Sequence, residues 1–257
     1  MRTPESMPQP YHSRLADRRA TPDQEGITFR MGCAVDIVRY SERSATLRHD
    51  ARGRLHSMLA ATLSDVGVDA GAVDAESTGD GVIAFLPSGA PLQLALPLLL
   101  HGMAERLHLD NARFRDRIRV RMATSIGPVR VDQTGFSENT VIELCRLLDS
   151  QTLRRAVDAR HSADLSVLVS RQLYACTVGA GHTGFHADEF RAVRIRAKGF
   201  QAAAWLWTPP DAGDSSMPCD VGAELGDCPH RLSQRLWARR APLAWGRRTT
   251  AQATRSL

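Results

Sequence analysis

Residues 71–86 read GAVDAESTGDGVIAFL and contain two short apolar runs, 71–77 and 82–86. The pair Asp80-Gly81 stands between these runs. An Asp-Gly pair between two apolar runs is a strong short-range signal for a β-hairpin, because both residues accept the backbone angles of a tight turn. We therefore predict two antiparallel strands here, and the neighbouring segments can be ordered around them.

Segments with strand and helix periodicity alternate on both sides of this hairpin. The order of the first six elements, β-α-β-β-α-β, is typical of a ferredoxin-like sandwich. We predict an α/β (α+β) protein with this core and additional C-terminal strands. The expected strands and helices outside the hairpin are 27–38, 45–66, 91–109, 118–131, 138–155, 165–169, 170–176, 190–197 and 201–207.

The chain of 257 residues is predicted to hold one domain between two irregular ends. Its composition, 43% hydrophobic and 24% charged, is that of a soluble globular protein and excludes a collagen-like or wholly disordered chain. Residues 1–25 are polar and proline-rich, which predicts a disordered N-terminal arm. Residues 26–208 form the predicted domain, and 209–257 are expected to be a flexible tail, first acidic and then Arg-rich.

No run of about 18 apolar residues is present, so no membrane span is expected. The N-terminal stretch has no continuous apolar segment of the kind that a secretory signal needs. These two features predict a cytoplasmic protein. Binding of nucleic acid through the Arg-rich tail is the less favoured explanation of its charge, because a solvated basic tail needs no partner.

Two acids occupy unusual positions for a sheet with a buried face. Asp36 follows the apolar residues of strand 27–38, and Asp80 lies in the hairpin turn. In the β-α-β-β-α-β order the first strand pairs beside the hairpin, so we expect both carboxylates at one end of the sheet. Paired carboxylates suit a hard divalent cation. Asp80 taken alone is equally well explained as an ordinary turn residue.

Five stretches, in order, resemble the catalytic domain of class III nucleotidyl cyclases and cover about residues 27–207. They are most similar to a divergent bacterial, actinobacterial-like subgroup with Gly-Asp-Gly and Arg-Leu-Leu-Asp motifs. The stretches are Asp36-Ile37 with Tyr40-Ser41, Glu76 to Gly81, Arg119 to Ala123, Glu138 to Val141 with Arg146-Leu147, and Ala197-Lys198-Gly199-Phe200.

The resemblance implies conversion of a nucleoside triphosphate to a 3',5'-cyclic nucleotide and pyrophosphate, in intracellular signalling. Asp36, Asp80 and the backbone carbonyl of Ile37 would bind two divalent metal ions, Mg²⁺ or Mn²⁺. Arg146 would be catalytic, stabilising charge on the α-phosphate. The resemblance also implies a homodimer whose active sites lie at the interface between the chains.

Two further binding residues follow from the same resemblance. Lys198 would neutralise the outer phosphates, and it is the only lysine beside 32 arginines. Arginine is used almost everywhere that a cation stands, so the exception suggests a position where a compact charge is needed. Glu76 would read the base, as in guanylate-selecting members.

The chain also departs from the family pattern. Gly135 stands where a second base-reading side chain is expected, so the choice between purine and pyrimidine stays open. Ile142 replaces the ribose-binding Asn, with Asn139 one turn away, and Arg39 replaces the glycine of the phosphate-cradling turn. The alternative is therefore a catalytically degenerate domain that binds nucleotide or dimerises. We lean towards an enzyme, because Asp36, Asp80, Arg146 and Lys198 are all retained.

Overall fold

The computed structural model describes residues 26–132, 135–197 and 199–210. The predicted N-terminal arm, Lys198 and the tail from residue 211 onward lie outside the described residues. Among the described helices, none combines the length and the apolar character that crossing a membrane requires.

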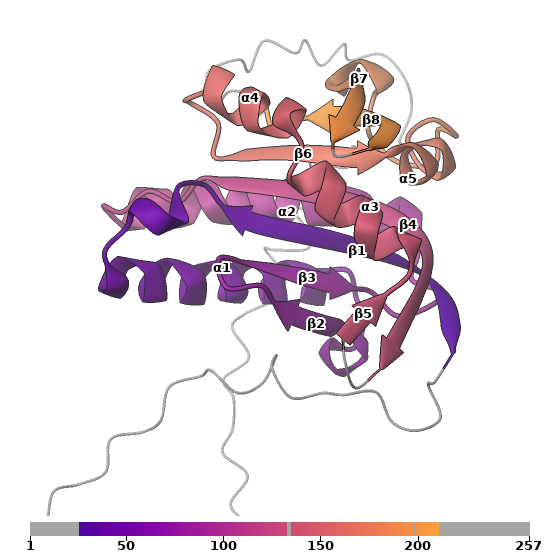
Figure 1. The fold of residues 1–257 in the computed structure, drawn as a ribbon, viewed down its shortest axis with the longest axis horizontal. Coiled ribbons are helices and arrows are strands. Elements are labelled where there is room, and N and C mark those ends of the chain that lie inside the picture. The colour runs from indigo at the N-terminus through magenta and orange to yellow at the C-terminus, as the bar shows by residue number, and fades with distance from the viewer. Residues whose placement is uncertain (1–25, 133–134, 198, 211–257) are drawn as a thin grey trace, which may run out of the picture. The chain divides into compact units, whose positions relative to one another are not determined.

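One mixed sheet forms the centre of the described domain (Figure 1). Its strands lie in the order β2-β3-β1-β4-β6-β8-β7, and β5 pairs with β4. All neighbours are antiparallel except β4 and β6, which are parallel. The strands are β1 (Ile27–Ile37), β2 (Asp74–Ser77), β3 (Gly81–Phe85), β4 (Val120–Asp132), β5 (Gly135–Ser137), β6 (Leu165–Ser170), β7 (Phe190–Ala197) and β8 (Phe200–Trp207).

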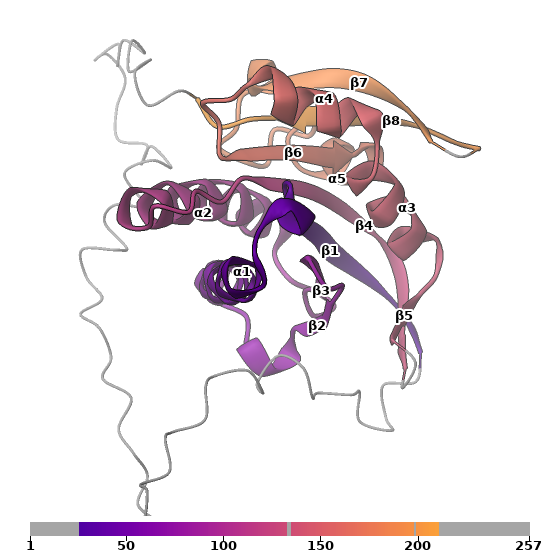
Figure 2. The ribbon, with the colours of Figure 1, turned by 60° about the vertical axis from the view of Figure 1, so that its left-hand side comes forward.

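The helices cover both faces of this sheet (Figure 2). Alternate residues of β1 point to opposite faces, as the strand period of two requires. Val35 packs in the core with α1 and α2, whereas Ala34 packs in the core with α3 and α4. The helices and short 3-10 turns are η2 (Tyr40–Glu42), α1 (Ala45–Asp65), η3 (Ala70–Ala72), α2 (Leu92–Arg113), α3 (Asn139–Leu148), α4 (Gln151–Ala159), α5 (Arg171–Cys176) and η4 (Ala187–Glu189).

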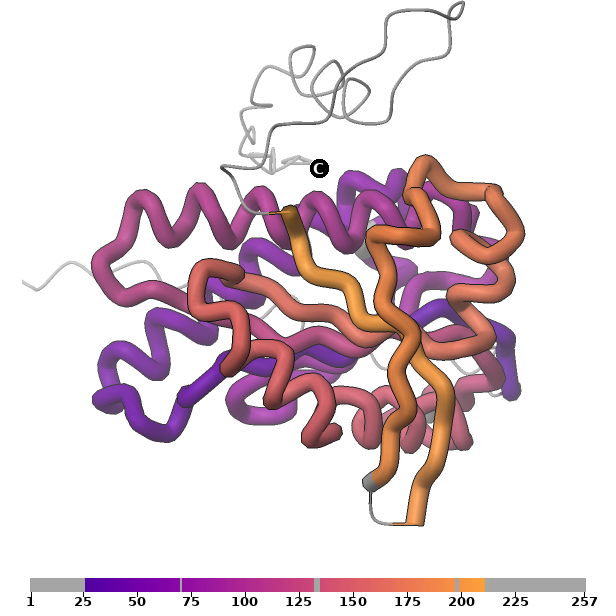
Figure 3. The backbone as a smooth tube through the Cα atoms, turned by 90° about the horizontal axis from the view of Figure 1, so that it is seen from above, coloured from indigo at the N-terminus to yellow at the C-terminus, as the bar shows by residue number. Residues whose placement is uncertain are grey.

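The predicted ferredoxin-like core with extra C-terminal strands is confirmed. The strand order β2-β3-β1-β4 places β1 in the middle of the core, between the hairpin and β4. Strands β6, β8 and β7 extend the sheet beyond β4, and the β7–β8 hairpin reaches past the neighbouring helices (Figure 3).

One predicted helix was wrong in its length. Instead of a single helix over 138–155, α3 ends at Leu148 and α4 begins after Ser150. The hydroxyl of Ser150 accepts a hydrogen bond from the backbone N–H of Leu153, and the serine is buried. This N-cap starts a new helix because its oxygen satisfies a backbone donor that has no partner inside the helix.

Candidate active site at the end of β1 and β3

The candidate site lies where the hairpin meets the end of β1. Asp36 pairs in register with Gly81, and the backbone N–H of Ile37 donates to the carbonyl of Asp80 at 3.2 Å. A Cβ atom on Gly81 would lie 2.0 Å from the carbonyl oxygen of Val35. Only glycine therefore allows the hairpin to approach β1 this closely, and this approach brings the two aspartates to one end of the sheet.

Asp36 has a buried carboxylate in which one oxygen is hydrogen-bonded to a described residue and the other is not. The residue is 7% exposed, and its Oδ2 accepts a hydrogen bond from the guanidinium of Arg121. Its Oδ1 is buried, and no donor among the described residues forms a hydrogen bond with it. Burial raises the pKa of Asp36 to about 6; the charge of Arg121 opposes this shift, and the charge of Asp80 adds to it. A cation at Oδ1 would relieve both unfavourable effects.

A cavity of about 570 Å³ opens beside these aspartates, and we call it the carboxylate pocket. Its walls come from the end of β1, the η2 turn, the hairpin, β4 and the α3–α4 junction. Within the described residues, no group of three or more His, Cys, Asp or Glu side chains could hold a metal ion. The pocket contains Asp36, Ile37, Asp80, Arg39, Glu42, Arg121, Asp149, Arg154 and Asp158 among its lining residues.

The oxygen atoms of Asp36, Ile37 and Asp80 fit a hard cation that takes its remaining ligands from substrate and water. Mg²⁺ is commonly held by one or two carboxylates together with substrate phosphates, and it retains several water molecules. Asp36 and Asp80 would supply the carboxylates, and Ile37 lines the same pocket. Two carboxylates alone make a weak site for a free ion, so such a cation would need further ligands from a bound phosphate and water.

Arg146 does not line the carboxylate pocket of its own chain. It is half-buried on α3, one turn after Ile142, so both residues lie on the same side of the helix. Cys145 and Leu148 line the pocket instead. Ile142 is 55% exposed, so a side of α3 that carries Arg146 faces solvent beside it.

Glu76 also lies outside the carboxylate pocket, exposed on β2. It is next to Gly135: a Cβ atom on Gly135 would lie 2.8 Å from Oε2 of Glu76. Gly135 has φ of 116°, a backbone conformation that side chains rarely adopt. The two positions to which the resemblance assigns base reading are therefore neighbours, and the local geometry disfavours any side chain at the second one.

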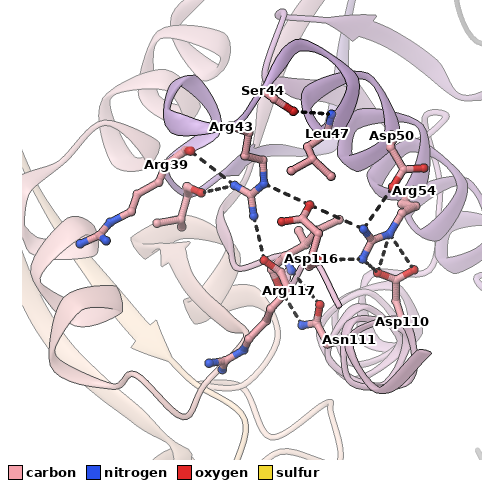
Figure 4. Close-up of polar contacts among 12 residues, drawn as sticks. Arg39, Arg43, Ser44, Leu47, Asp50, Arg54, Asp110, Asn111, Asp116 and Arg117 are labelled. Atoms are coloured by element: carbon pink, nitrogen blue, oxygen red, sulfur yellow. Dashed lines mark hydrogen bonds and ion pairs between the residues drawn. The ribbon is translucent and has the colours of Figure 1, made fainter. Parts of the chain in front are cut away.

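The turn after β1 keeps a left-handed shape although glycine is absent. Arg39 has φ 55° and ψ 35°. Arg43 braces this turn, because its guanidinium donates to the carbonyls of Val38 at 3.0 Å and Arg117 at 2.8 Å and pairs with Asp116 (Figure 4). Arg39 therefore adopts the left-handed conformation that glycine accepts most easily.

Glu138 is the second residue that holds a glycine-like conformation, with φ 92° and ψ 168°. This region is populated almost only by glycine and costs other residues about 1–3 kcal/mol. We expect Glu138→Gly to raise the free energy of unfolding by about 1 kcal/mol, after the greater freedom of glycine in the unfolded chain is subtracted. The ion pair that is lost, with Arg130 at 3.6 Å, is half-exposed and contributes little.

Urea unfolding followed by circular dichroism checks this expectation. Ser137→Gly is the matched control, because Ser137 is exposed and lies outside the set of residues with positive φ. It should lower stability by about 0.5–1 kcal/mol. Equal destabilisation by both substitutions would show that Glu138 carries no strain.

Arg121 is the site residue that sequence reasoning missed. It was placed in a core strand, and its pairing with Asp36 depends on the register between β1 and β4, where the two residues are direct partners. The signal in the sequence was weak: Arg119 and Arg121 alternate with Val120 and Met122, which put the arginines on one face of the strand. Its buried Nε atom has no hydrogen-bond partner in the described part of the chain, so one donor of the guanidinium is unused there.

The raised pKa of Asp36 predicts how the stability of the metal-free protein changes with pH. The folded protein holds a proton on Asp36 up to about pH 6, whereas the ordinary value of 3.8 means that the unfolded chain has already released it. Stability therefore falls as pH rises through this window, by at most about 1.4 kcal/mol per pH unit.

The measurement is urea unfolding in EDTA between about pH 4 and pH 7, for the wild-type protein and for Asp36→Asn. Asparagine does not titrate, so the difference between the two curves isolates Asp36. The wild-type protein should gain stability relative to the variant as the pH is lowered. A difference that does not change with pH would contradict the raised pKa.

Comparisons with known proteins give a match in structure and none in sequence. No family model matches the chain, and no curated protein matches it. A crystal structure of an adenylate/guanylate cyclase/hydrolase from Silicibacter pomeroyi matches with a TM-score of 0.52 and 16% identity, over 72% of this chain and 99% of that one. The guanylyl cyclase Cya2 matches with a TM-score of 0.50 and 14% identity, over 76% and 98%. The described domain thus has the fold of a cyclase catalytic domain.

Proposed function

We propose that the protein is a class III-like nucleotidyl cyclase, a phosphorus-oxygen lyase that converts a nucleoside triphosphate to a 3',5'-cyclic nucleotide and pyrophosphate. The observation that carries this proposal is the meeting of Asp36 and Asp80 at the ends of neighbouring strands, with Oδ1 of Asp36 buried and unpartnered. A buried carboxylate oxygen without a partner is costly, and its retention favours a cation as the missing partner.

Asp36, Asp80 and the carbonyl of Ile37 would hold two divalent ions, Mg²⁺ or Mn²⁺. When bound, such ions lower the pKa of a coordinated hydroxyl and neutralise phosphate charge. Arg121 holds the carboxylate of Asp36 in place through Oδ2. Within the described residues, Oδ1 is left without a hydrogen-bond donor. In the reaction the ribose 3'-oxygen bonds to the α-phosphorus, the bond to the β-phosphate oxygen breaks, and the hydroxyl proton is released.

Arg146, Lys198 and Glu76 would complete the site from outside the carboxylate pocket. A guanidinium presents several donors in a rigid fork, which suits Arg146 to stabilising charge on the α-phosphate. Lys198 would neutralise the outer phosphates, and Glu76 would read the base without help from Gly135. The relationship to a divergent bacterial subgroup and a cytoplasmic role in signalling remain predictions.

A homodimer is part of this proposal. Arg146 lies outside the pocket of its own chain, and its side of α3 is open beside the exposed Ile142. In a head-to-tail dimer, Arg146 and Lys198 of one chain would meet the two aspartates of the other. A single chain would then lack a complete site.

Incubation of the purified protein with each of the four nucleoside triphosphates and Mn²⁺ tests the proposal. We expect a cyclic monophosphate and pyrophosphate from at least one of them, identified by mass spectrometry. Because Gly135 cannot contribute a side chain, a preference between purines and pyrimidines is an additional result of the same assay. The absence of a cyclic product from all four nucleotides would reject the proposal.

The second candidate function is a degenerate domain that binds nucleotide and dimerises without catalysis. Ile142 favours it, because an exposed aliphatic side chain cannot hydrogen-bond a ribose. Under this alternative the protein binds a triphosphate and releases none of it as pyrophosphate, and Asp36→Ala leaves its cellular role intact. Loss of that role in Asp36→Ala would count against the alternative.

A further inference from the structure

A second cavity, of about 300 Å³, adjoins the carboxylate pocket and has a different charge. Four arginines and one histidine line it, and among the described residues Glu42 is the only acid in its lining. We call it the basic cavity. Its cationic lining residues are Arg39, Arg43, Arg117, Arg119 and His161, from the η2 turn, the segment before β4 and the segment after α4.

Arg43 is the structural member of this set. Its guanidinium is held by Asp116 and three backbone carbonyls, and Asp116 in turn contacts Arg54 (Figure 4). Arg54 is anchored by Asp110 at 2.5 Å. In Figure 4 the guanidinium groups of Arg39 and Arg117 point away from this ion-pair network. The network therefore fixes the wall of the cavity without using those two guanidinium groups. Arg117 pairs instead with Asp164 at 2.7 Å and donates to the carbonyl of Ser162 at 2.9 Å.

Arg119 carries the least compensated charge of the cavity. Its guanidinium donates to the backbone carbonyls of Ala163 at 3.2 Å, Arg160 at 2.9 Å and Val157. Within the described residues no carboxylate forms an ion pair with it. Burial lowers the pKa of Arg119, and the neighbouring charge of Arg117 lowers it further. The charges of Asp158 and Asp164 act in the opposite direction and raise it. A partly buried cation under these conditions is stabilised by an anion.

Arg39 adds a charge at a position that is unfavourable for any side chain. Its left-handed φ of 55° suits glycine, yet an arginine stands there, 69% exposed at the side chain. Its only ion pair within the described part of the chain is with Glu42 at 4.0 Å, the limit of such a contact. Arg39, Val38 and Glu42 line both cavities, so the two cavities are neighbours across the η2 turn.

We propose that the basic cavity is a second binding site, distinct from the carboxylate pocket, for a phosphate-bearing anion. A phosphate group offers several charged acceptor oxygens and can engage more than one guanidinium fork at once. Among the described lining residues, the carboxylate pocket has five acids and three arginines, whereas the basic cavity has one acid and four arginines. The balance of charge in the second cavity therefore favours an anion. The anion is either the diphosphate that the proposed reaction releases or a separate phosphorylated effector.

Isothermal titration of the full chain with inorganic phosphate and with inorganic diphosphate, in EDTA, tests this proposal. Arg117→Gln removes one charge from the cavity, together with the ion pair to Asp164 at 2.7 Å, at a side chain that is 44% exposed. We expect it to weaken binding of the anion about tenfold or more, the effect of losing a charge-assisted hydrogen bond. Arg119→Gln is the second variant, and thermal melts of both report whether the fold is retained.

Arg171→Gln is the matched control, because Arg171 is exposed on α5 and does not line either cavity. It removes the same net charge and should leave binding unchanged. No measurable binding by the wild-type protein, or an equal loss in Arg171→Gln, would overturn the proposal. The second result would show that the anion responds only to net charge.

Asp80→Asn separates the two cavities. Removing an acid from the carboxylate pocket should leave binding in EDTA unchanged or slightly stronger if the anion occupies the basic cavity. Loss of binding in this variant would place the anion in the carboxylate pocket and overturn the proposal. The titration measures binding and not turnover. The absence of a cyclic product in the activity assay would therefore reject the proposed cyclase function without contradicting the binding result.

A comparison of the two anions distinguishes their sources. Diphosphate that binds much more tightly than phosphate, and inhibits cyclic nucleotide formation less in Arg117→Gln than in the wild-type protein, identifies the released product. Equal affinity for both anions identifies a phosphorylated effector. Either pattern, if it depends on Arg117, supports the site.

Discussion

Asp80→Asn is expected to lower the rate of cyclic nucleotide formation by about 10³-fold or more. A metal ion contributes several kcal/mol to transition-state stabilisation, and each 1.36 kcal/mol corresponds to about a tenfold rate change. The amide is neutral and nearly the same size as the carboxylate, so the hairpin turn should keep its backbone hydrogen bond from Ile37 to residue 80. The loss should therefore appear in the rate and not in the melting temperature.

Mn²⁺-dependent product formation and a thermal melt of the same preparation measure this result. Asp188→Asn, at an exposed acid in η4, is the matched control and should retain full activity. The wild-type melting temperature should also rise with Mn²⁺ and a triphosphate, and that of Asp80→Asn should not. Full activity in Asp80→Asn would mean that the convergence of the two aspartates has no catalytic role.

The second large effect is expected when two inactive chains are combined. Arg146→Ala should lose about 10²–10³-fold in rate, the usual effect of removing one group that stabilises transition-state charge. When it is co-expressed with Asp80→Asn, each mixed dimer should contain one site with both substitutions and one intact site. Since random pairing makes about half of the dimers mixed, activity should recover to about a quarter of the wild-type value.

The measurement compares the activity of the co-expressed mixture with that of each variant alone, after the dimer fraction of each preparation is isolated by size-exclusion chromatography. If Arg146 served the carboxylate pocket of its own chain, every chain in the mixture would be defective and no recovery would occur. That outcome would reject the shared site but not the role of Asp80. A mixture without recovered activity would therefore show that Arg146 does not act across the dimer interface.

The core of the fold could be predicted because its signals are local. The Asp80-Gly81 pair predicted the hairpin, although its turn lies at residues 78–80 and Gly81 begins β3. The order of the remaining periodic segments then allowed only a few arrangements. The same reasoning placed Asp36 and Asp80 together, since β1 must lie beside the hairpin in this topology. Their proximity is a consequence of chain order and did not require side-chain detail.

What the sequence could not give depends on long-range register and on small local breaks. The pairing of Arg121 with Asp36 joins residues far apart in the chain and is visible only once β1 and β4 are aligned. The break at Ser150 interrupts an apolar pattern that continues through both helices. The basic cavity likewise gathers residues from three separate segments, and each arginine alone looks like an ordinary surface charge.

The conformations of Arg39 and Glu138 have a consequence for how the stability of this domain can change in evolution. Both residues have positive φ, the backbone region that glycine adopts most readily. Each position therefore costs folding free energy that a substitution by glycine would recover. Glycine at these two positions would raise the free energy of unfolding, and that gain could offset destabilising substitutions in the binding site.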